Sequence, residues 1–295
     1  MARPARPYRS VLYIPASKER ALEKAKGLQA DAIIFDLEDA VAVEEKARAR
    51  SLLAETLNAG GYGARALLSR INGMETEWGA EDLAALMETG PHAILLPKVE
   101  TGADVAAVAA RLDAHESCAR TEIWAMMETP RGILNAAEIA RAPRMRGFVM
   151  GTNDLAKDLD ARFRADRLPL QMALQTCVLA ARVEGIACID GVYNAFRDEA
   201  GLRAECEQGR DLGMDGKTLI HPAQLDIANA VFAPTEDELV LARRQIAAFE
   251  EARSRGEGVA VVDGRIVENL HVDTARSLIA KADAIRALAP REAAA

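Results

Sequence analysis

Residues 31–39 read DAIIFDLED, in which a mainly apolar run over residues 32–37 ends in the acidic side chains Asp36, Glu38 and Asp39. Near-continuous apolar runs of this length are typical of strands that are buried on both faces, as in parallel sheets. Seven more such runs cover residues 11–14, 66–71, 93–96, 123–127, 147–150, 186–189 and 218–220. The sequence therefore predicts eight buried strands.

The segments between these runs have helical spacing and are rich in strong helix formers. They cover residues 18–28, 43–57, 80–87, 103–112, 133–140, 170–184 and 199–212. A strand followed by a helix, repeated in this way, predicts an α/β fold of the (β/α)₈ TIM-barrel type. The alternative is an open doubly wound sheet, which the lack of a G-x-G-x-x-G motif after the first strand disfavours.

The composition changes after Pro222, where helical segments replace the alternation. These are AQLDIANAVF, ELVLARRQIAAFEEARSRG and an amphipathic stretch over residues 273–288, with the hairpin VAVVDGRIVEN before the last. Asp263-Gly264 is a type I′ turn signal within that hairpin. We expect a catalytic barrel domain over residues 1–222 and a C-terminal helical arm or lid over residues 223–295 that does not fold independently.

Composition and charge exclude several classes of protein. The 295 residues are 50% apolar and 28% charged, with a net charge of −8, which is unlike a disordered chain and disfavours binding to nucleic acid. No apolar run is long enough for a signal peptide or a membrane span. The four cysteines form no C-x-x-C pair, so we expect reduced thiols and a cytoplasmic location.

Polar and charged side chains follow nearly every predicted strand. In a TIM barrel the active site forms where the strands end, so these side chains should converge on one rim. They are Ser17, Lys18, Asp36, Glu38, Asp39, Arg70, Asn72, Lys98, Glu128, Asn153, Asp154, Asp190 and His221.

Glu128 and Asp154 end neighbouring strands, with an acidic group formed by Asp36, Glu38 and Asp39 nearby. Oxygen ligands without His or Cys favour a hard cation, and a small number of carboxylates favours Mg²⁺ over Ca²⁺. The same residues could instead form salt bridges with Arg70 and Lys98.

Two cationic features have more than one interpretation. Arg70 suits bidentate capture of a substrate carboxylate, but it could equally pair with the acidic group. Lys18 and Lys24, on the first predicted helix, could hold phosphates. Their alternation with Glu19 and Glu23 is also typical of a solvated helix face, which the residues alone favour.

Eight motifs, taken in order, resemble the citrate lyase beta-subunit and malyl-CoA lyase family over residues 9–287. They are RSVLYIPASKERALEKA, IIFDLEDAVAVEEKARAR, SRING, LLPKVET, AMMETPRGI, MGTNDLA, DGVYNAF and GKTLIHPAQL. The resemblance implies a (β/α)₈ barrel, Mg²⁺ as cofactor, a homotrimer or hexamer, and a CoA thioester of a 3-hydroxy acid with a second carboxylate as substrate.

The resemblance also implies roles for individual residues. Glu128 and Asp154 match the Mg²⁺ ligands, Arg70 matches the residue that holds the oxoacid carboxylate, and Asp36 supports it together with Glu38 and Asp39. The positions that match substrate and CoA contacts are Tyr13, Lys18, Lys24, Asn153, Val192 and Tyr193. The family commonly has Phe where this chain has Tyr13.

One motif departs from the family. Many family lyases have a D/E-G-x-M/L-V/I-D stretch whose last Asp enters a neighbouring subunit's active site as an acid or base. Here the stretch reads VDGRIVE and ends in Glu268, which is one methylene longer. Since a misplacement of about 1 Å can cost on the order of 10²-fold in rate, this change bears on the carbon–carbon chemistry.

The resemblance therefore implies several activities. We expect first a lyase that cleaves a malyl-CoA-like thioester to glyoxylate, or a related oxoacid, plus an acyl-CoA. The alternatives are a thioesterase that releases malate and CoA, a citrate lyase beta-type subunit that works within a complex, and a CoA-independent aldolase.

Overall fold

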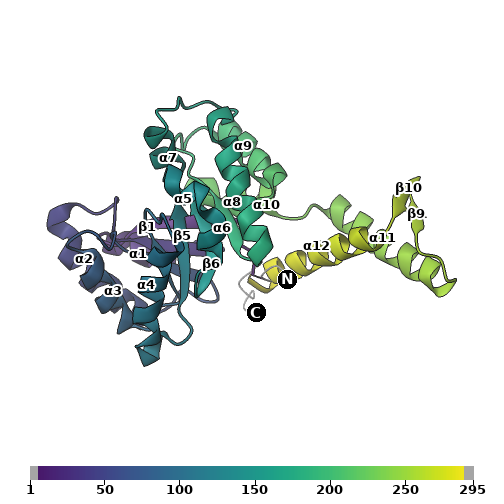
Figure 1. The fold of residues 1–295 in the computed structure, drawn as a ribbon. Coiled ribbons are helices and arrows are strands. Elements are labelled where there is room, and N and C mark those ends of the chain that lie inside the picture. The colour runs from purple at the N-terminus through teal and green to yellow at the C-terminus, as the bar shows by residue number, and fades with distance from the viewer. Residues whose placement is uncertain (1–5, 289–295) are drawn as a thin grey trace. The chain divides into compact units, whose positions relative to one another are not determined.

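The computed structural model describes residues 6–288 and contains a closed barrel of eight parallel strands (Figure 1). Neighbouring strands pair in chain order, and β1 also pairs with β8. This confirms the predicted (β/α)₈ TIM barrel. The strands are β1 (Ser10–Pro15), β2 (Ala32–Asp36), β3 (Ala66–Arg70), β4 (Ala93–Leu96), β5 (Glu122–Met127), β6 (Met145–Met150), β7 (Ala187–Asp190) and β8 (Gly216–Leu219).

Helices follow the strands along the chain. They are α1 (Glu19–Ala25), α2 (Lys46–Ala59), α3 (Gly79–Met87), α4 (Gly102–Asp113), α5 (Pro130–Leu134), α6 (Ala136–Ala140), α7 (Thr152–Asp158), α8 (Gln171–Glu184), α9 (Glu199–Leu212) and α10 (Leu225–Phe232), with short 3₁₀ turns η1 (Val43–Glu45), η2 (Glu116–Cys118), η3 (Leu168–Leu170) and η4 (Pro222–Gln224). Local sequence sets several ends: Thr101 caps α4 in a capping box, Thr129 caps α5 with Pro130 following, and Gly185 and Gly213 end α8 and α9 in the left-handed conformation.

The helices differ from the sequence prediction in two places. The single helix expected over residues 133–140 is divided between α5 and α6, because Asn135 leaves helical geometry with φ −98° and ψ 11°. The helix α7 was not predicted. It begins two residues after β6, in a short polar stretch that resembles a loop in composition.

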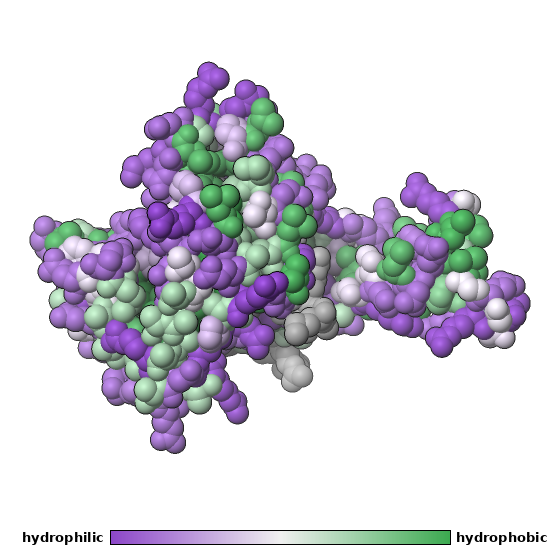
Figure 2. Space-filling view, viewed as in Figure 1, coloured by the Kyte–Doolittle hydropathy of each residue, from purple (hydrophilic) through white to green (hydrophobic). Residues whose placement is uncertain are grey.

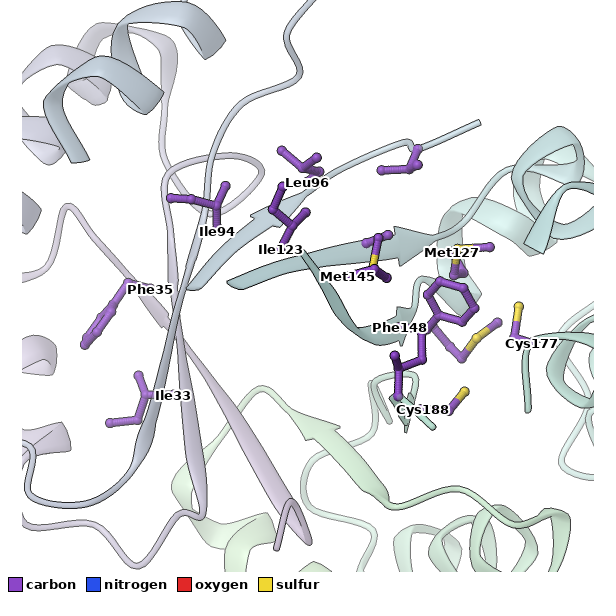
Figure 3. Close-up of a cluster of buried hydrophobic side chains, with 14 of the residues drawn as sticks. Ile33, Phe35, Ile94, Leu96, Ile123, Met127, Met145, Phe148, Cys177 and Cys188 are labelled. Atoms are coloured by element: carbon purple, nitrogen blue, oxygen red, sulfur yellow. The ribbon is translucent and has the colours of Figure 1, made fainter. Parts of the chain in front are cut away.

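Alternate strand residues pack into two separate apolar clusters. Val11, Ile34, Leu68 and Trp124 belong to a cluster that fills the barrel interior. Strand residues of the other parity pack beneath the helices in a larger cluster, part of which is shown in Figure 3, with Phe35, Ile94, Phe148 and Cys188 among its members. Burial on both faces explains why the strands read as continuous apolar runs.

The close approach of a tryptophan ring to the neighbouring strand requires a glycine inside the barrel. A Cβ added to Gly147 on β6 would lie 2.3 Å from ring atoms of Trp124 on β5. The indole ring therefore occupies the space that a side chain would need, which is a common reason for glycine within a strand.

The four cysteines are free and buried. Burial raises the pKa of Cys177 and Cys206 to about 12, so neither thiol is a reactive thiolate at neutral pH. Within residues 6–288, no helix combines the length and apolarity that a membrane span requires.

The chain divides into two compact units, with the boundary after Phe232 rather than after residue 222. The physical reason is α10, which packs on α9 and against β1 and β8. Asn229 on α10 accepts a hydrogen bond from Ser10 Oγ at 2.8 Å and donates one to the Gln29 carbonyl at 2.7 Å. These bonds make α10 the last helix of the barrel.

The second unit, described to residue 288, has its own small core. It contains α11 (Glu236–Ser254), the hairpin β9 (Ala260–Val262) and β10 (Arg265–Val267), and α12 (Asn269–Leu288). Ala252, Val262, Val267 and Val272 pack together between these elements. Asp263 and Gly264 have φ values of 51° and 73°, as the predicted type I′ turn requires.

The surface in Figure 2 is mainly hydrophilic, with apolar side chains gathered in places over the barrel helices. On α8 the exposed apolar residues Met172, Leu179 and Val183 are spaced by seven and four positions, which places them on one helix face. An apolar stripe of this kind is typical of a surface that contacts another protein.

Candidate active site

A cavity of about 350 Å³ lies where the barrel strands end. Strands β1, β2, β3, β5 and β6 and the segments that follow β6 and β7 all contribute to its lining. The sequence-predicted residues that line it are Tyr13, Asp36, Asp39, Arg70, Glu128, Asn153, Asp154 and Val192.

Other predicted residues lie elsewhere. Tyr193 lines an adjoining cavity, and its hydroxyl donates a hydrogen bond to Asp198 Oδ2 at 2.6 Å. Lys18 and Lys24 are exposed at the start and in the last turn of α1, and neither lines the first cavity. Glu268 is exposed in the second unit, between β10 and α12.

Arg70 is buried and surrounded by carboxylates. Strand register places Asp36 beside Arg70, and Asp36 accepts from Arg70 Nε at 2.8 Å and from Nη2 at 2.6 Å. Nη1 lies 2.7 Å from Glu38 Oε2 and 3.4 Å from Asp39 Oδ2. Of the two interpretations of Arg70, the geometry shows the ion pairs with the acidic group, while the guanidinium still contributes to the cavity wall.

Lys98 links this ion cluster to Glu128. Its Nζ donates to Glu38 Oε1 at 3.1 Å, and its backbone N–H donates to Glu128 Oε1 at 2.8 Å. Lys98 has φ 49°, a left-handed conformation that non-glycine residues seldom adopt and that often marks functional sites. The sequence identified Lys98 as a charged residue after a strand and as a possible salt-bridge partner of the acidic group, and the ion pair with Glu38 agrees with this. No sequence signal indicates its backbone conformation.

Glu128 is a buried carboxyl group in an acidic environment. Burial first, and then the charges of Glu38 and Asp154, raise its pKa to about 7, although the Lys98 amide opposes the shift. A Cβ added to Gly151 would lie 2.4 Å from Glu128 Oε2, so glycine is required where the chain passes this carboxylate.

The donor set fits Mg²⁺. Glu128 and Asp154 line the same cavity, and both offer only oxygen ligands. Among residues 6–288 no group of three or more His, Cys, Asp or Glu side chains could hold a metal. Two carboxylates leave the remaining ligand positions to water and substrate, which is the usual arrangement for Mg²⁺.

The raised pKa of Glu128 leads to a stability prediction for the metal-free protein. Since the folded-state pKa exceeds the unfolded value, Glu128 favours folding only while it is protonated, and this contribution is lost as the pH rises from about 4.5 to about 7. We expect Glu128→Gln to raise the free energy of unfolding at pH 8 by at most roughly 3 kcal/mol. Urea unfolding in EDTA should show this difference shrinking as the pH falls toward 4.5, and a constant difference would contradict it.

A pair of asparagines stands between two cavities. Asn194 Nδ2 donates to Asn153 Oδ1 at 2.9 Å, and Asn153 Nδ2 donates to Asn194 Oδ1 at 3.3 Å. Both residues, with Thr152 and Val192, line the first cavity and a second of about 350 Å³. The second is also lined by Arg162, Phe163, Arg164 and Tyr193.

A buried ionic network lies beneath the segment after β7. Asp190 accepts from Arg167 Nη1 at 2.7 and 2.9 Å, and Lys217 Nζ lies 3.4 Å from Asp190 and 2.6 Å from Glu205. Lys217 also donates to the Gly191 carbonyl at 2.6 Å, next to the cavity residue Val192. Sequence reasoning missed Arg167 and Lys217. A lysine inside the strand GKTL was the available signal, because an unpaired lysine is almost never fully buried.

Fold and site together define a class: a (β/α)₈-barrel protein with a carboxylate pair suited to a divalent cation at the C-terminal rim. The chain belongs to the HpcH/HpaI aldolase/citrate lyase family, whose model matches residues 9–222. The family prediction is therefore confirmed.

Individual relatives cover nearly the whole chain. A protein named (3S)-malyl-CoA thioesterase from Cereibacter sphaeroides (strain KD131 / KCTC 12085) is 64% identical over 287 residues, covering 97% of this chain and 99% of its own. The L-malyl-CoA/beta-methylmalyl-CoA lyase of C. sphaeroides (strain ATCC 17029 / ATH 2.4.9) is 34% identical, covering 97% and 98%. The structure of CitE from Mycobacterium tuberculosis with magnesium, acetoacetate and coenzyme A aligns with a TM-score of 0.79 and 30% identity, covering 95% of this chain and 100% of its own.

Proposed function

We propose that the protein hydrolyses the thioester of (3S)-malyl-CoA, or a closely similar acyl-CoA, to the free acid and CoA. The observation that carries this proposal is the 64% identity, over 97% of the chain, to a (3S)-malyl-CoA thioesterase. This identity favours the thioesterase, which the sequence analysis gave as an alternative, over the lyase that the sequence first favoured. The cavity at the strand ends, with its carboxylates and buried arginine, supports an enzyme of this kind.

Mg²⁺ is the proposed cofactor, with Glu128 and Asp154 as its protein ligands. When bound, it would supply Lewis-acid polarisation of a substrate oxygen and neutralise nearby carboxylate charge. The magnesium in the M. tuberculosis structure supports this assignment. Lys98 would orient Glu128 through its amide, in the way that outer hydrogen bonds fix metal ligands.

Different residues would bind different parts of the substrate. Arg70, held by Asp36 with support from Glu38 and Asp39, would present positive charge to the substrate carboxylate from the cavity wall. Lys18 and Lys24 are exposed cations of α1, available for the phosphates of CoA. Asn153, Val192 and Tyr193 would contact the acyl and pantetheine portions near the boundary of the two cavities.

The second candidate is the lyase reaction, which the 34% identical malyl-CoA lyase favours. In that case Glu268 would act as the acid or base from a neighbouring chain of a homotrimer or hexamer, and the C-terminal arm would be the lid that carries it. The exposed position of Glu268 and the apolar face of α8 are compatible with such an assembly.

Product analysis tests the proposal. We expect purified protein with (3S)-malyl-CoA and Mg²⁺ to release malate and CoA in equal amounts, measured by chromatography of the acids and titration of the free thiol. Glyoxylate and acetyl-CoA as the main products would replace the proposal with the lyase. No turnover of free CoA esters would instead favour a citrate lyase beta-type subunit.

A further inference from the structure

The hydroxyl group of Tyr13 lies in the cavity without a strong hydrogen-bond acceptor. The Tyr13 side chain on β1 lines the cavity and extends across the barrel interior toward β5. Its ring packs against the Arg70 guanidinium, with 5.1 Å from Arg70 Cζ to the ring centroid. Among the described residues its hydroxyl has one hydrogen-bond partner, the thioether sulfur of Met126 at 3.4 Å. Since a thioether is a weak acceptor, a substrate oxygen can replace it at little cost.

Three other residues of the cavity lining have side-chain donors that are already engaged. The Arg70 guanidinium is bound to Asp36 and paired with the neighbouring carboxylates. Asn153 and Asn194 bind each other. Thr152 supplies the second hydroxyl of the cavity lining, and this hydroxyl lies close to Gly191, where an added Cβ would lie 2.4 Å from Thr152 Oγ1. Tyr13 therefore offers the cavity a hydroxyl donor that is free of any strong protein acceptor.

Hydrolysis of a thioester needs such a donor. Attack on the carbonyl carbon places negative charge on the carbonyl oxygen, and donors aimed at this oxygen lower the barrier. The cavity is also lined by Asp36, Asp39, Glu128 and Asp154, and carboxylate charge on these residues repels developing negative charge. A neutral O–H donor can stabilise the oxyanion without pairing permanently with these carboxylates.

We propose that Tyr13 is a catalytic residue whose hydroxyl donates a hydrogen bond to the thioester carbonyl oxygen as that oxygen becomes an oxyanion. This inference rests on the proposed function. A water oxygen forms a bond to the carbonyl carbon, and the carbonyl π electrons move to the oxygen held by Tyr13. When the C=O bond re-forms, the C–S bond breaks and the sulfur acquires the proton that the water has lost. Tyr13 keeps its own proton throughout, and burial, which raises its pKa well above the ordinary value, favours this.

The test is Tyr13→Phe, which keeps the ring on Arg70 and removes only the hydroxyl. We expect kcat for (3S)-malyl-CoA hydrolysis to fall by about 10²–10³-fold, the usual cost of one oxyanion donor, with KM changed by less than about threefold. The matched control is Tyr62→Phe, which removes a buried hydroxyl that is bonded to the Leu22 carbonyl at 2.9 Å and does not line the cavity, and which should leave kcat unchanged.

Three results would overturn the inference. One is a kcat for Tyr13→Phe within about threefold of the wild type. Another is a loss seen mainly in KM, which would make Tyr13 a binding residue only. The third is a large fall in kcat for Thr152→Val that is absent for Tyr13→Phe. Failure of the proposed function is separate, because it would show as glyoxylate and acetyl-CoA made by the wild-type protein.

Discussion

Substitution of Glu128 by Gln should reduce Mg²⁺-dependent turnover of (3S)-malyl-CoA by on the order of 10³-fold or more. A metal that acts as Lewis acid is worth several kcal/mol of transition-state stabilisation, and each 1.36 kcal/mol is about tenfold in rate. Gln keeps the size of the side chain and can still accept the Lys98 N–H bond, now 2.8 Å long, but it lacks the charge that holds a divalent cation. Steady-state kinetics with a Mg²⁺ titration measures both effects.

Glu122→Gln is the matched control, because Glu122 begins the same strand, β5, at the end away from the cavity. It should leave both kcat and the Mg²⁺ midpoint unchanged. The stability gain expected for metal-free Glu128→Gln separates a lost metal site from a lost fold. If Glu128→Gln retained turnover within about tenfold of the wild type, with the same Mg²⁺ midpoint, the metal assignment would have to be abandoned.

The barrel was predictable because its physical cause is visible in single residues. Strands that are buried on both faces are apolar at most positions, so runs such as residues 32–37, in which Asp36 is the single charged residue, stand out from the helical segments. Chain order then fixes the rim, because parallel strands end on the same side. This is why Asp36, Arg70, Glu128 and Asp154 could be grouped without coordinates.

The arrangement within the site was less predictable, because it depends on backbone conformation and side-chain direction. Sequence left open whether Arg70 pairs with the acidic residues, and only the distances to Asp36 and Glu38 show that it does. The left-handed conformations of Lys98 and Arg167, with φ 49° and 51°, have no signature in the residues themselves. The ion pairs of Arg70 join residues that are far apart in the chain, so the periodicity of the sequence carries no information about them.

The network around Asp190 leads to the largest expected effect on stability. Asp190 is fully buried at the end of β7 and is paired with Arg167 and Lys217, which are also buried. We expect Asp190→Asn to lower the free energy of unfolding by about 3–5 kcal/mol, because removing one partner of a buried ion pair leaves uncompensated charge. Urea unfolding at pH 7 measures this difference.

The acid dependence provides an independent test of the same network. The charges of Lys217 and Arg167 outweigh the effect of burial and lower the pKa of Asp190 below its usual 3.8. Asp190 therefore stabilises the fold above that pH, and its contribution is lost as the pH falls through the lowered pKa. The wild type should lose more stability in this acid range than Asp190→Asn does. Asp158→Asn, at an exposed position at the end of α7, should change stability by less than about 0.5 kcal/mol. Equal unfolding midpoints for the two variants would show that the buried network does not stabilise the barrel.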